Sequence, residues 1–327
     1  MRTFFWALLI AIFSSQIHAS ELMHRSLLED EKNNHTFVWE ETQLKPFDEL
    51  IVSWDAERPL NGSYLIQVSL LTSAWSPWLD YAFWSAYDQH SYIKCLPHLN
   101  IQVSQAAVEV LQNNKASGFR IRILANEKAS LDGFRALHIS AIDRNTHAVS
   151  FIPSENVLVS LKVHGISQMA LPHKHHLRLC SPTSTTAVMN FLSGHLNYSP
   201  IEFANSIIDS TFGIYGNWIL NTAQASHLLG HPWHCFVARL TTFNQIIDQL
   251  LKGYPVVVSI IGPLQGGVLP YEAGHLMVVT GYNSENKEVF CMDPAFPTDD
   301  LTCVRYPLNE FLTAWSRTKG IAYIFNQ

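Results

Sequence analysis

The sequence predicts a chain of two parts, an all-β sandwich followed by an α+β domain in which helices precede an antiparallel sheet. Short alternating segments separated by turn residues run from about residue 36 to residue 163, a pattern typical of a β-sandwich. Helical periodicity dominates residues 182–252, and apolar strand-like segments follow it, which is typical of an α+β domain. The length of 327 residues also exceeds what one ordinary core accommodates.

The first 19 residues are predicted to be a secretory signal peptide. Arg2 gives the positive start, residues 4–13 form an apolar run, and Ala19 ends a tolerable cleavage site. This run is too short to span a bilayer, and no later segment reaches about 18 uncharged apolar residues. We therefore expect a secreted or periplasmic protein with no transmembrane anchor. The formal net charge of -6 and the absence of a basic stretch argue against a nucleic-acid partner.

Export would place the five cysteines in a compartment that permits disulfides. Five is an odd number and a sparse one for a disulfide scaffold, so at least one thiol is free or is paired outside the chain. Cys291 and Cys303 flank a Pro-rich turn and are the pair suspected of forming a bridge.

Residues 20–162 are predicted to be the sandwich and to act as an accessory domain. Residues 106–112 have an ambiguous pattern that is also compatible with a helix. A cluster of aromatic residues has two interpretations, the core of the sandwich or an exposed surface that contacts a glycan or a cell-surface partner. The cluster consists of Trp75, Trp78, Tyr81, Phe83, Trp84, Tyr87 and Tyr92.

Helix signals then follow one another. Ser181 is expected to cap a helix over residues 182–193, with Gly194 as its stop. The other predicted helices are 201–210 after Ser199 and Pro200, 218–229 between Asn217 and Gly230, and one that opens at Thr241 or Thr242 and runs to Lys252.

Cys180 stands directly before the first of these helices. Unpaired backbone N–H groups and the positive end of the helix dipole favour a thiolate at such a position. The alternative is an inert cysteine that only packs against the helix. The choice between them depends on whether a base lies nearby.

His275 and Asp293 are the candidates for that base and its orienting group. His275 follows Gly274 at the start of an apolar strand, and Asp293 ends the next strand before Pro294. An antiparallel pair of strands joined near residues 283–286 brings both side chains to one end of a sheet. A Cys at a helix start, a His on a strand and an Asp opposite it is the geometry of papain-like enzymes.

Acyl transfer also requires donors for the oxyanion. The backbone N–H of Cys180 is one expected donor, and the side-chain amide of Gln168 is the candidate for the second. The interval between these two residues is longer than in papain.

Six motifs in order carry a resemblance over roughly residues 163–327. They are Ser167-Gln168, Cys180-Ser181-Pro182-Thr183-Ser184, Gly216-Asn217-Trp218, residues 253–260, residues 274–282 and Asp293-Pro294-Ala295. This set resembles the papain-like cysteine peptidases related to the bacteriocin-processing, double-glycine-leader peptidases, and in particular an exported bacterial branch with a β-rich N-terminal region.

The resemblance implies that residues 163–327 form a papain-like peptidase domain. Cys180 would be the nucleophile, His275 the general base and acid, Asp293 its orienting residue and Gln168 the oxyanion donor. The substrate would be a peptide or protein, and no metal or organic cofactor is implied.

Asn217, Trp218 and Gly274 are candidates for lining the substrate cleft, although capping and core packing also explain Asn217 and Trp218. Two alternatives remain open: a catalytically idle papain-like protein that binds a glycan or a protein, and a transglutaminase-like acyl transferase on the same fold. The run His173-Lys174-His175-His176 contains potential metal ligands. Lys174 interrupts it and no Cys, Asp or Glu stands at fixed spacing, so no metal site is predicted there.

Overall fold

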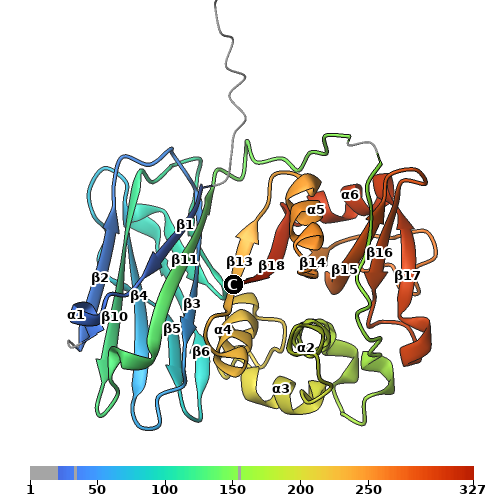
Figure 1. Ribbon diagram of the computed structural model, residues 1–327. Helices are drawn as coiled ribbons and strands as arrows, with labels where there is room; N and C mark the ends of the chain where they lie inside the picture. The colour runs from blue at the N-terminus through green and yellow to red at the C-terminus, as the bar shows by residue number, and fades with distance from the viewer. Residues whose placement is uncertain (1–20, 33–34, 154–155) are drawn as a thin grey trace, which may run out of the picture.

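The structure is a computed structural model that describes residues 21–32, 35–153 and 156–327 (Figure 1). The predicted signal peptide at residues 1–19 lies outside the described residues. Within these ranges, no helix is long and apolar enough to cross a membrane.

Residues 21–142 form two antiparallel sheets that pack face to face (Figure 1). Trp54 and Trp84 meet edge to face across the layers with ring centroids 5.8 Å apart, and this contact lies in one continuous apolar core. The first sheet has the order β1 (Glu21–Ser26), β11 (Phe134–Ile142), β3 (Glu49–Ala56), β9 (Ala107–Val110), β8 (Ile101–Ser104) and β7 (Ile93–Leu96). The second has the order β2 (Thr36–Glu41), β10 (Gly118–Asn126), β4 (Ser63–Leu71), β5 (Leu79–Ser85) and β6 (Gln89–Ser91), and the short helix α1 is Glu29–Lys32.

A third antiparallel sheet, of seven strands, dominates the rest of the chain. Its order is β13 (His234–Arg239), β18 (Ile321–Asn326), β14 (Val256–Ile260), β15 (His275–Asn283), β16 (Glu288–Met292) and β17 (Cys303–Pro307), with β12 (Leu158–Ser160) paired to β15. Strands β14 and β15 alternate between two apolar cores: Leu276 and Val278 belong to one, and Met277 and Val279 to the other. Both faces of the sheet are therefore covered.

Helices supply that cover (Figure 1). One group packs on the face that carries Leu276, and the other packs on the opposite face. The first group is α2 (Cys180–Ser193), α3 (Pro200–Ile207) and α4 (Trp218–Leu229), and the second is α5 (Phe243–Leu251) and α6 (Leu308–Ser316).

Most of the predicted helix ends are confirmed. Ser199 caps α3, Asn217 and Gly230 flank α4, and Gly194 ends α2 in the left-handed conformation. The predicted N-cap of α2 is wrong, because this helix begins at Cys180 with Leu179 as its N-cap. The short turn over residues 176–178 runs directly into the helix, and the Ser181 hydroxyl bonds to the Tyr323 hydroxyl at 2.9 Å instead of capping it.

The predicted fold class, an all-β sandwich followed by a papain-like α+β domain, is wrong. Strands make up 38% of the chain and helices 23%, in three antiparallel sheets. In the C-terminal part, helices do not simply precede the strands: β12 joins the sheet before α2, β13 lies between α4 and α5, and α6 lies between β17 and β18. Strands β12, β13 and β17 are short, have no strong alternating pattern and were not predicted. The division at residues 162 and 163 stays a prediction.

Strand β13 joins the third sheet to the first. It is the edge strand of the third sheet, and three of its backbone N–H groups are bound by side chains of the first sheet. Cys235 donates to the Asp55 carboxylate at 3.0 Å, Val237 to the Ser53 hydroxyl at 3.0 Å and Arg239 to the Ser140 hydroxyl at 3.1 Å. An edge that would otherwise expose unpaired groups is thereby covered.

A buried ion pair crosses the same junction. The Arg239 guanidinium forms two hydrogen bonds to the Glu49 carboxylate of β3, one of them Nη2 to Oε2 at 2.8 Å. Both side chains are at least nine-tenths buried. The charge of each therefore depends on the other for compensation.

The suspected disulfide between Cys291 and Cys303 is wrong: all five cysteines are free. In the register of β16 and β17, Cys291 lies opposite Val304 and Cys303 opposite Met292. The two thiols consequently point to opposite faces of the sheet. Cys291 is buried, whereas Cys303 is exposed.

Glu49→Gln is expected to lower the free energy of unfolding by about 3–5 kcal/mol, because it leaves the buried Arg239 charge uncompensated. Denaturant unfolding of the full chain measures this change. The matched control is Glu288→Gln, which removes the partner of the exposed Arg305 at 3.6 Å and is expected to cost about 1 kcal/mol or less. Equal losses of unfolding free energy in the two variants would contradict a stabilising role for the buried ion pair of Arg239 and Glu49.

Candidate active site

The start of α2 is fixed to the third sheet by two side chains. Ser181 bonds to Tyr323 of β18, and the Ser184 hydroxyl donates to the Leu276 carbonyl at 3.0 Å. Cys180 is the first residue of this helix, and it is half-buried. These contacts hold its thiol beside the beginning of β15.

His275 begins β15, and its imidazole lies beside the Cys180 thiol, whose pKa it lowers by hydrogen bonding and by its charge. The other side of the ring is held by Asp293: Nε2 lies 2.7 Å from Asp293 Oδ1. This leaves Nδ1 for the thiol. Because β15 and β16 are antiparallel neighbours, His275 and Asp293 meet at one end of the sheet, as the sequence predicted.

The Asp293 carboxylate is fully buried, and each of its two oxygens accepts two hydrogen bonds. Oδ1 accepts from His275 and from the backbone N–H of Ala295 at 3.0 Å. Oδ2 accepts from the hydroxyls of Tyr271 and Tyr306, each at 2.7 Å. A carboxylate with these partners has one possible orientation and stays ionised.

Tyr271 also contacts the imidazole directly. Its ring stacks on that of His275, with centroids 4.5 Å apart and planes inclined by 16°. Neither Tyr271 nor Tyr306 was predicted as a site residue, because a tyrosine in a loop and one in a short edge strand have no local signal that links them to a carboxylate elsewhere. In the register of β16 and β17, Tyr306 lies opposite Val289, and only its side-chain hydroxyl reaches Asp293.

Electrostatics favour an ion pair between thiolate and imidazolium. Burial by itself would lower the pKa of His275, but the Asp293 charge and hydrogen bond and the contact with Cys180 outweigh it and raise the pKa to about 10. Burial would raise the pKa of Cys180, but the hydrogen bond and charge of His275 and the backbone N–H groups of Leu276 and Ser181 lower it. The same imidazolium and both tyrosine hydroxyls hold the pKa of the Asp293 carboxyl down despite its burial.

Cys180 borders a pocket of about 390 Å³. Two of the three predicted cleft residues, Trp218 and Gly274, line this pocket with it. The third, Asn217, does not line it: its amide nitrogen donates to Asp209 at 2.7 Å and to Ser91 of β6 at 3.0 Å. Asn217 therefore ties the start of α4 to the N-terminal sheets.

Gln168 lies close to the site, but its amide is engaged. Its backbone N–H donates to the Pro294 carbonyl at 2.9 Å, which places it beside Asp293. Its Nε2 donates to the His176 carbonyl at 2.9 Å, whereas Oε1 is buried with no hydrogen-bond partner among the described residues. One of the two amide hydrogens is thus used to hold the segment that precedes Cys180.

The histidine run packs near this segment. His173 and His175 flank the ring of Tyr215, with centroids 5.7 and 5.9 Å away, and His176 Nδ1 contacts the His173 carbonyl at 3.1 Å. The His176 contact folds the loop between Gln168 and Cys180 onto itself, and the rings of His173 and His175 pack the loop against Tyr215.

The aromatic cluster of the N-terminal sheets is mainly packed within the protein. Tyr81 and Trp84 are fully buried. Trp75 and Trp78 are half-buried beneath arginines, with the Arg120 guanidinium 4.3 Å from the Trp75 ring centroid and 4.9 Å from that of Trp78. Of the seven, only Tyr87 is mostly exposed, at 96%. These contacts give no support to a glycan-binding surface.

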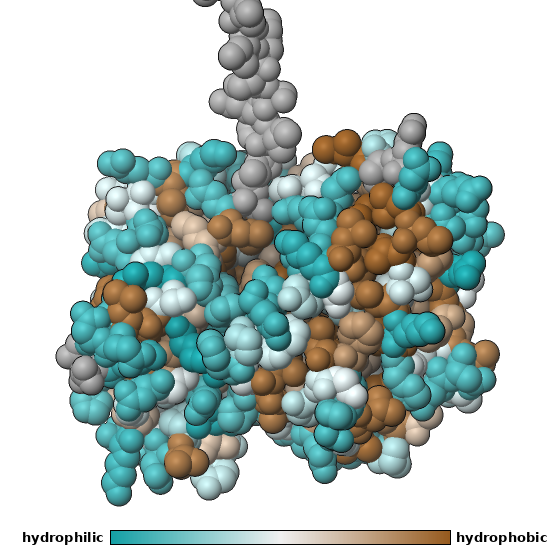
Figure 2. Space-filling view, viewed as in Figure 1, coloured by the Kyte–Doolittle hydropathy of each residue, from teal (hydrophilic) through white to brown (hydrophobic). Residues whose placement is uncertain are grey.

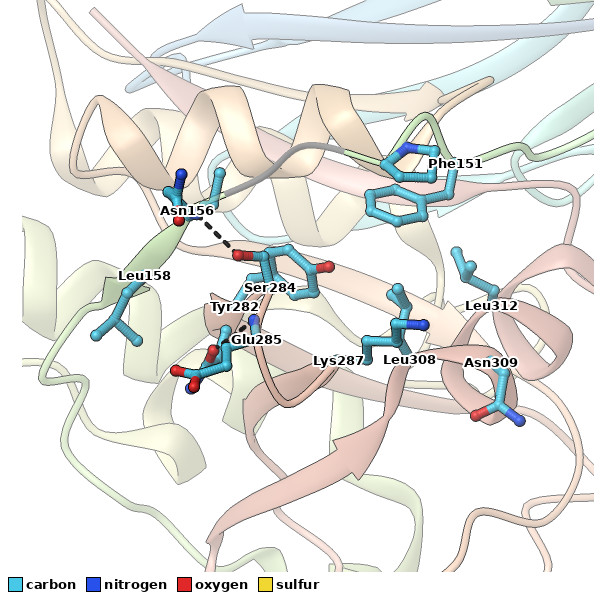
Figure 3. A pocket seen from close by; sticks show the side chains of 13 residues that line it. Phe151, Asn156, Leu158, Tyr282, Ser284, Glu285, Lys287, Leu308, Asn309 and Leu312 are labelled. Atoms are coloured by element: carbon cyan, nitrogen blue, oxygen red, sulfur yellow. Dashed lines mark hydrogen bonds between the residues drawn. The ribbon is translucent and has the colours of Figure 1, made fainter.

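A second and larger pocket, of about 1190 Å³, lies on the α6 side of the third sheet. Figure 3 shows Tyr282 in its middle, between Leu158 and Leu312. Figure 2 shows apolar side chains gathered over this region. Neither Cys180 nor His275 lines it, so its walls have no part in the candidate active site.

A helix-borne thiol, an imidazole and a buried carboxylate in one chain of contacts is the arrangement that defines cysteine hydrolases. Residues 160–323, half of the chain, match the model of the Peptidase_C39-like family, and the chain belongs to this family. Membership supports a cysteine peptidase with a peptide or protein substrate. No curated protein matches the sequence. The relation to bacteriocin-processing peptidases and to an exported branch stays a prediction.

Alkylation of Cys180 by iodoacetamide is expected to remain fast from neutral to mildly acidic pH, because His275 lowers its pKa and the thiolate is the reactive form. Exposed Cys95 and Cys303 serve as internal references, and peptide mass spectrometry follows each thiol separately. As the pH rises through about 10, the imidazolium is lost.

The matched variant is Asp293→Asn. Removing the negative charge lowers the pKa of His275, so the imidazolium disappears at lower pH and the pKa of Cys180 rises. Alkylation at neutral pH should then slow toward that of the exposed thiols. A wild-type Cys180 profile that coincides with those of Cys95 and Cys303 would refute the ion pair.

Proposed function

We propose that the protein is an exported cysteine peptidase that hydrolyses peptide or amide bonds through a thioester acyl-enzyme. The observation that carries this proposal is the unbroken series of contacts from Cys180 through His275 to Asp293. Cys180 is the nucleophile, His275 the general acid and base, and Asp293 the residue that orients the imidazolium. Membership of the Peptidase_C39-like family supports the same reaction class.

In the first half of the reaction, the Cys180 sulfur adds to the substrate carbonyl carbon. The C–N bond then breaks as His275 transfers the proton on Nδ1 to the leaving amine. In the second half, His275 takes a proton from water, and the resulting hydroxide equivalent attacks the thioester. Cys180 leaves as the thiolate, and the imidazolium is restored.

The oxyanion that forms in both halves needs nearby donors. The backbone N–H of Cys180 lies in the first turn of α2, where no intrahelical acceptor exists. Gln168 is the proposed second donor through the amide hydrogen that does not bond to His176. The position of Gln168 beside Pro294 supports this assignment.

The pocket beside Cys180 favours a substrate with negative charge. Arg239, Arg317 and Lys319 line it, and no carboxylate is among its lining residues. The charge of Arg239 is compensated by Glu49, which leaves Arg317 and Lys319 to attract an acidic side chain or a terminal carboxylate. A peptide library enriched in Asp and Glu is therefore the substrate set of choice.

Action outside the cytoplasm, secreted or periplasmic, is the part of this proposal that rests on the sequence. It is supported by the signal-like residues 1–19.

Hydrolysis and acyl transfer share the thioester step, and an added amine acceptor separates them: hydrolysis yields the free acid, whereas transfer yields a new amide.

Cys180→Ala is expected to abolish turnover of the library, whereas the matched change Cys303→Ala, at an exposed thiol outside the site, should leave it unchanged. Gln168→Ala should lower kcat roughly 10²–10³-fold with a smaller effect on KM, the loss typical of one oxyanion donor. Cleavage is measured by mass spectrometry of the products. Undiminished cleavage by purified Cys180→Ala would refute the proposal.

A further inference from the structure

Three histidines meet at the junction of the N-terminal sheets with the third sheet, away from Cys180. His24 and His138 are direct neighbours across the antiparallel pair of β1 and β11, and His234 begins β13 (Figure 1). Their potential ligand atoms all lie within 4.8 Å of one another. The residues are far apart in the sequence, so no spacing motif reveals them.

The spacing between two of these nitrogens suits a shared cation. His24 Nδ1 lies 3.1 Å from His138 Nδ1. Two nitrogens bound to one zinc ion at about 2.0–2.1 Å in tetrahedral geometry lie roughly 3.3–3.4 Å apart. His24 is exposed on an edge strand, so a cation has access from solvent and the ring is free to adjust.

One buried carboxylate orients the other two rings. Asp55 Oδ2 lies 2.7 Å from His138 Nε2 and 2.6 Å from His234 Nδ1. If each of these nitrogens donates its hydrogen to Asp55, then His138 Nδ1 and His234 Nε2 carry the free lone pairs. A carboxylate that binds the second nitrogen of a ligating histidine is the usual outer partner of a metal site.

We propose that His24, His138 and His234 form a binding site for a divalent transition-metal cation of the zinc type, with Asp55 as the carboxylate that orients two of the ligands. Three imidazoles leave one position open for water. The bound cation would link β1 and β11 of the first sheet to β13 of the third. It would thereby stabilise the same junction that the ion pair of Arg239 and Glu49 crosses. This site is distinct from the candidate active site around Cys180, for which no metal is predicted.

The full chain in a Cys180→Ser background tests this site, since the catalytic thiol would itself bind a soft cation. After treatment with a chelator, the protein is titrated with Zn²⁺ and with Co²⁺ alone. We expect one site by calorimetry, a Co²⁺ absorption spectrum without a thiolate charge-transfer band, and a metal-dependent rise in Tm.

His24→Ala is expected to weaken binding about tenfold or more and to remove the rise in Tm, because one of three ligands is lost. His98→Ala, at another exposed histidine, is the matched control and should bind as the parent does. Asp55→Asn should weaken binding roughly 10–100-fold, with circular dichroism to verify its fold.

The histidine run of residues 173–176 is the competing site, and His173→Ala with His175→Ala tests it. Unchanged binding in that double variant supports the proposal. Binding that is lost there and kept in His24→Ala would overturn it, as would a parent protein that binds neither cation.

Discussion

The buried carboxylate of Asp293 is the group on which the geometry and charge of the candidate active site depend. It accepts four hydrogen bonds, from His275, Ala295, Tyr271 and Tyr306. The negative charge outweighs the burial of His275 and raises its pKa, and the imidazolium in turn lowers the pKa of Cys180. Without a fixed carboxylate, a buried imidazole would be neutral and the thiol would be protonated.

The third sheet supplies the positions that this arrangement needs. Antiparallel pairing of β15 and β16 brings His275 and Asp293 to one end of the sheet, and the Tyr306 hydroxyl of β17 reaches the same carboxylate. Helix α2 is tied to the same sheet through Ser181 and Ser184. The N-terminal sheets contribute from outside: Glu49 holds Arg239, which lines the pocket beside Cys180. The first half of the chain thus positions one residue that lines the pocket, whereas every proposed catalytic residue comes from the second half.

Local signals in the sequence predicted part of this structure. Capping residues located α3 and α4 closely, and the strand-turn-strand pattern around residues 275–293 placed His275 next to Asp293. The fold class was wrong, because β12, β13 and β17 are short and are defined by their neighbours and not by alternation. Contacts between distant segments, such as Tyr271 and Tyr306 with Asp293 or His24 with His234, have no local signature and require the fold.

Nitrogen NMR of His275 in the full chain tests the central claim most directly, since it reports the protonation of both ring nitrogens. We expect Nδ1 and Nε2 both to carry hydrogen at neutral pH and to keep it until the pH approaches about 10. In Cys180→Ala the imidazolium should lose its hydrogen at lower pH, because the thiolate no longer stabilises it. A His275 ring that titrates near its ordinary value of about 6.5 in the unaltered protein would contradict the ion pair of Cys180 and His275.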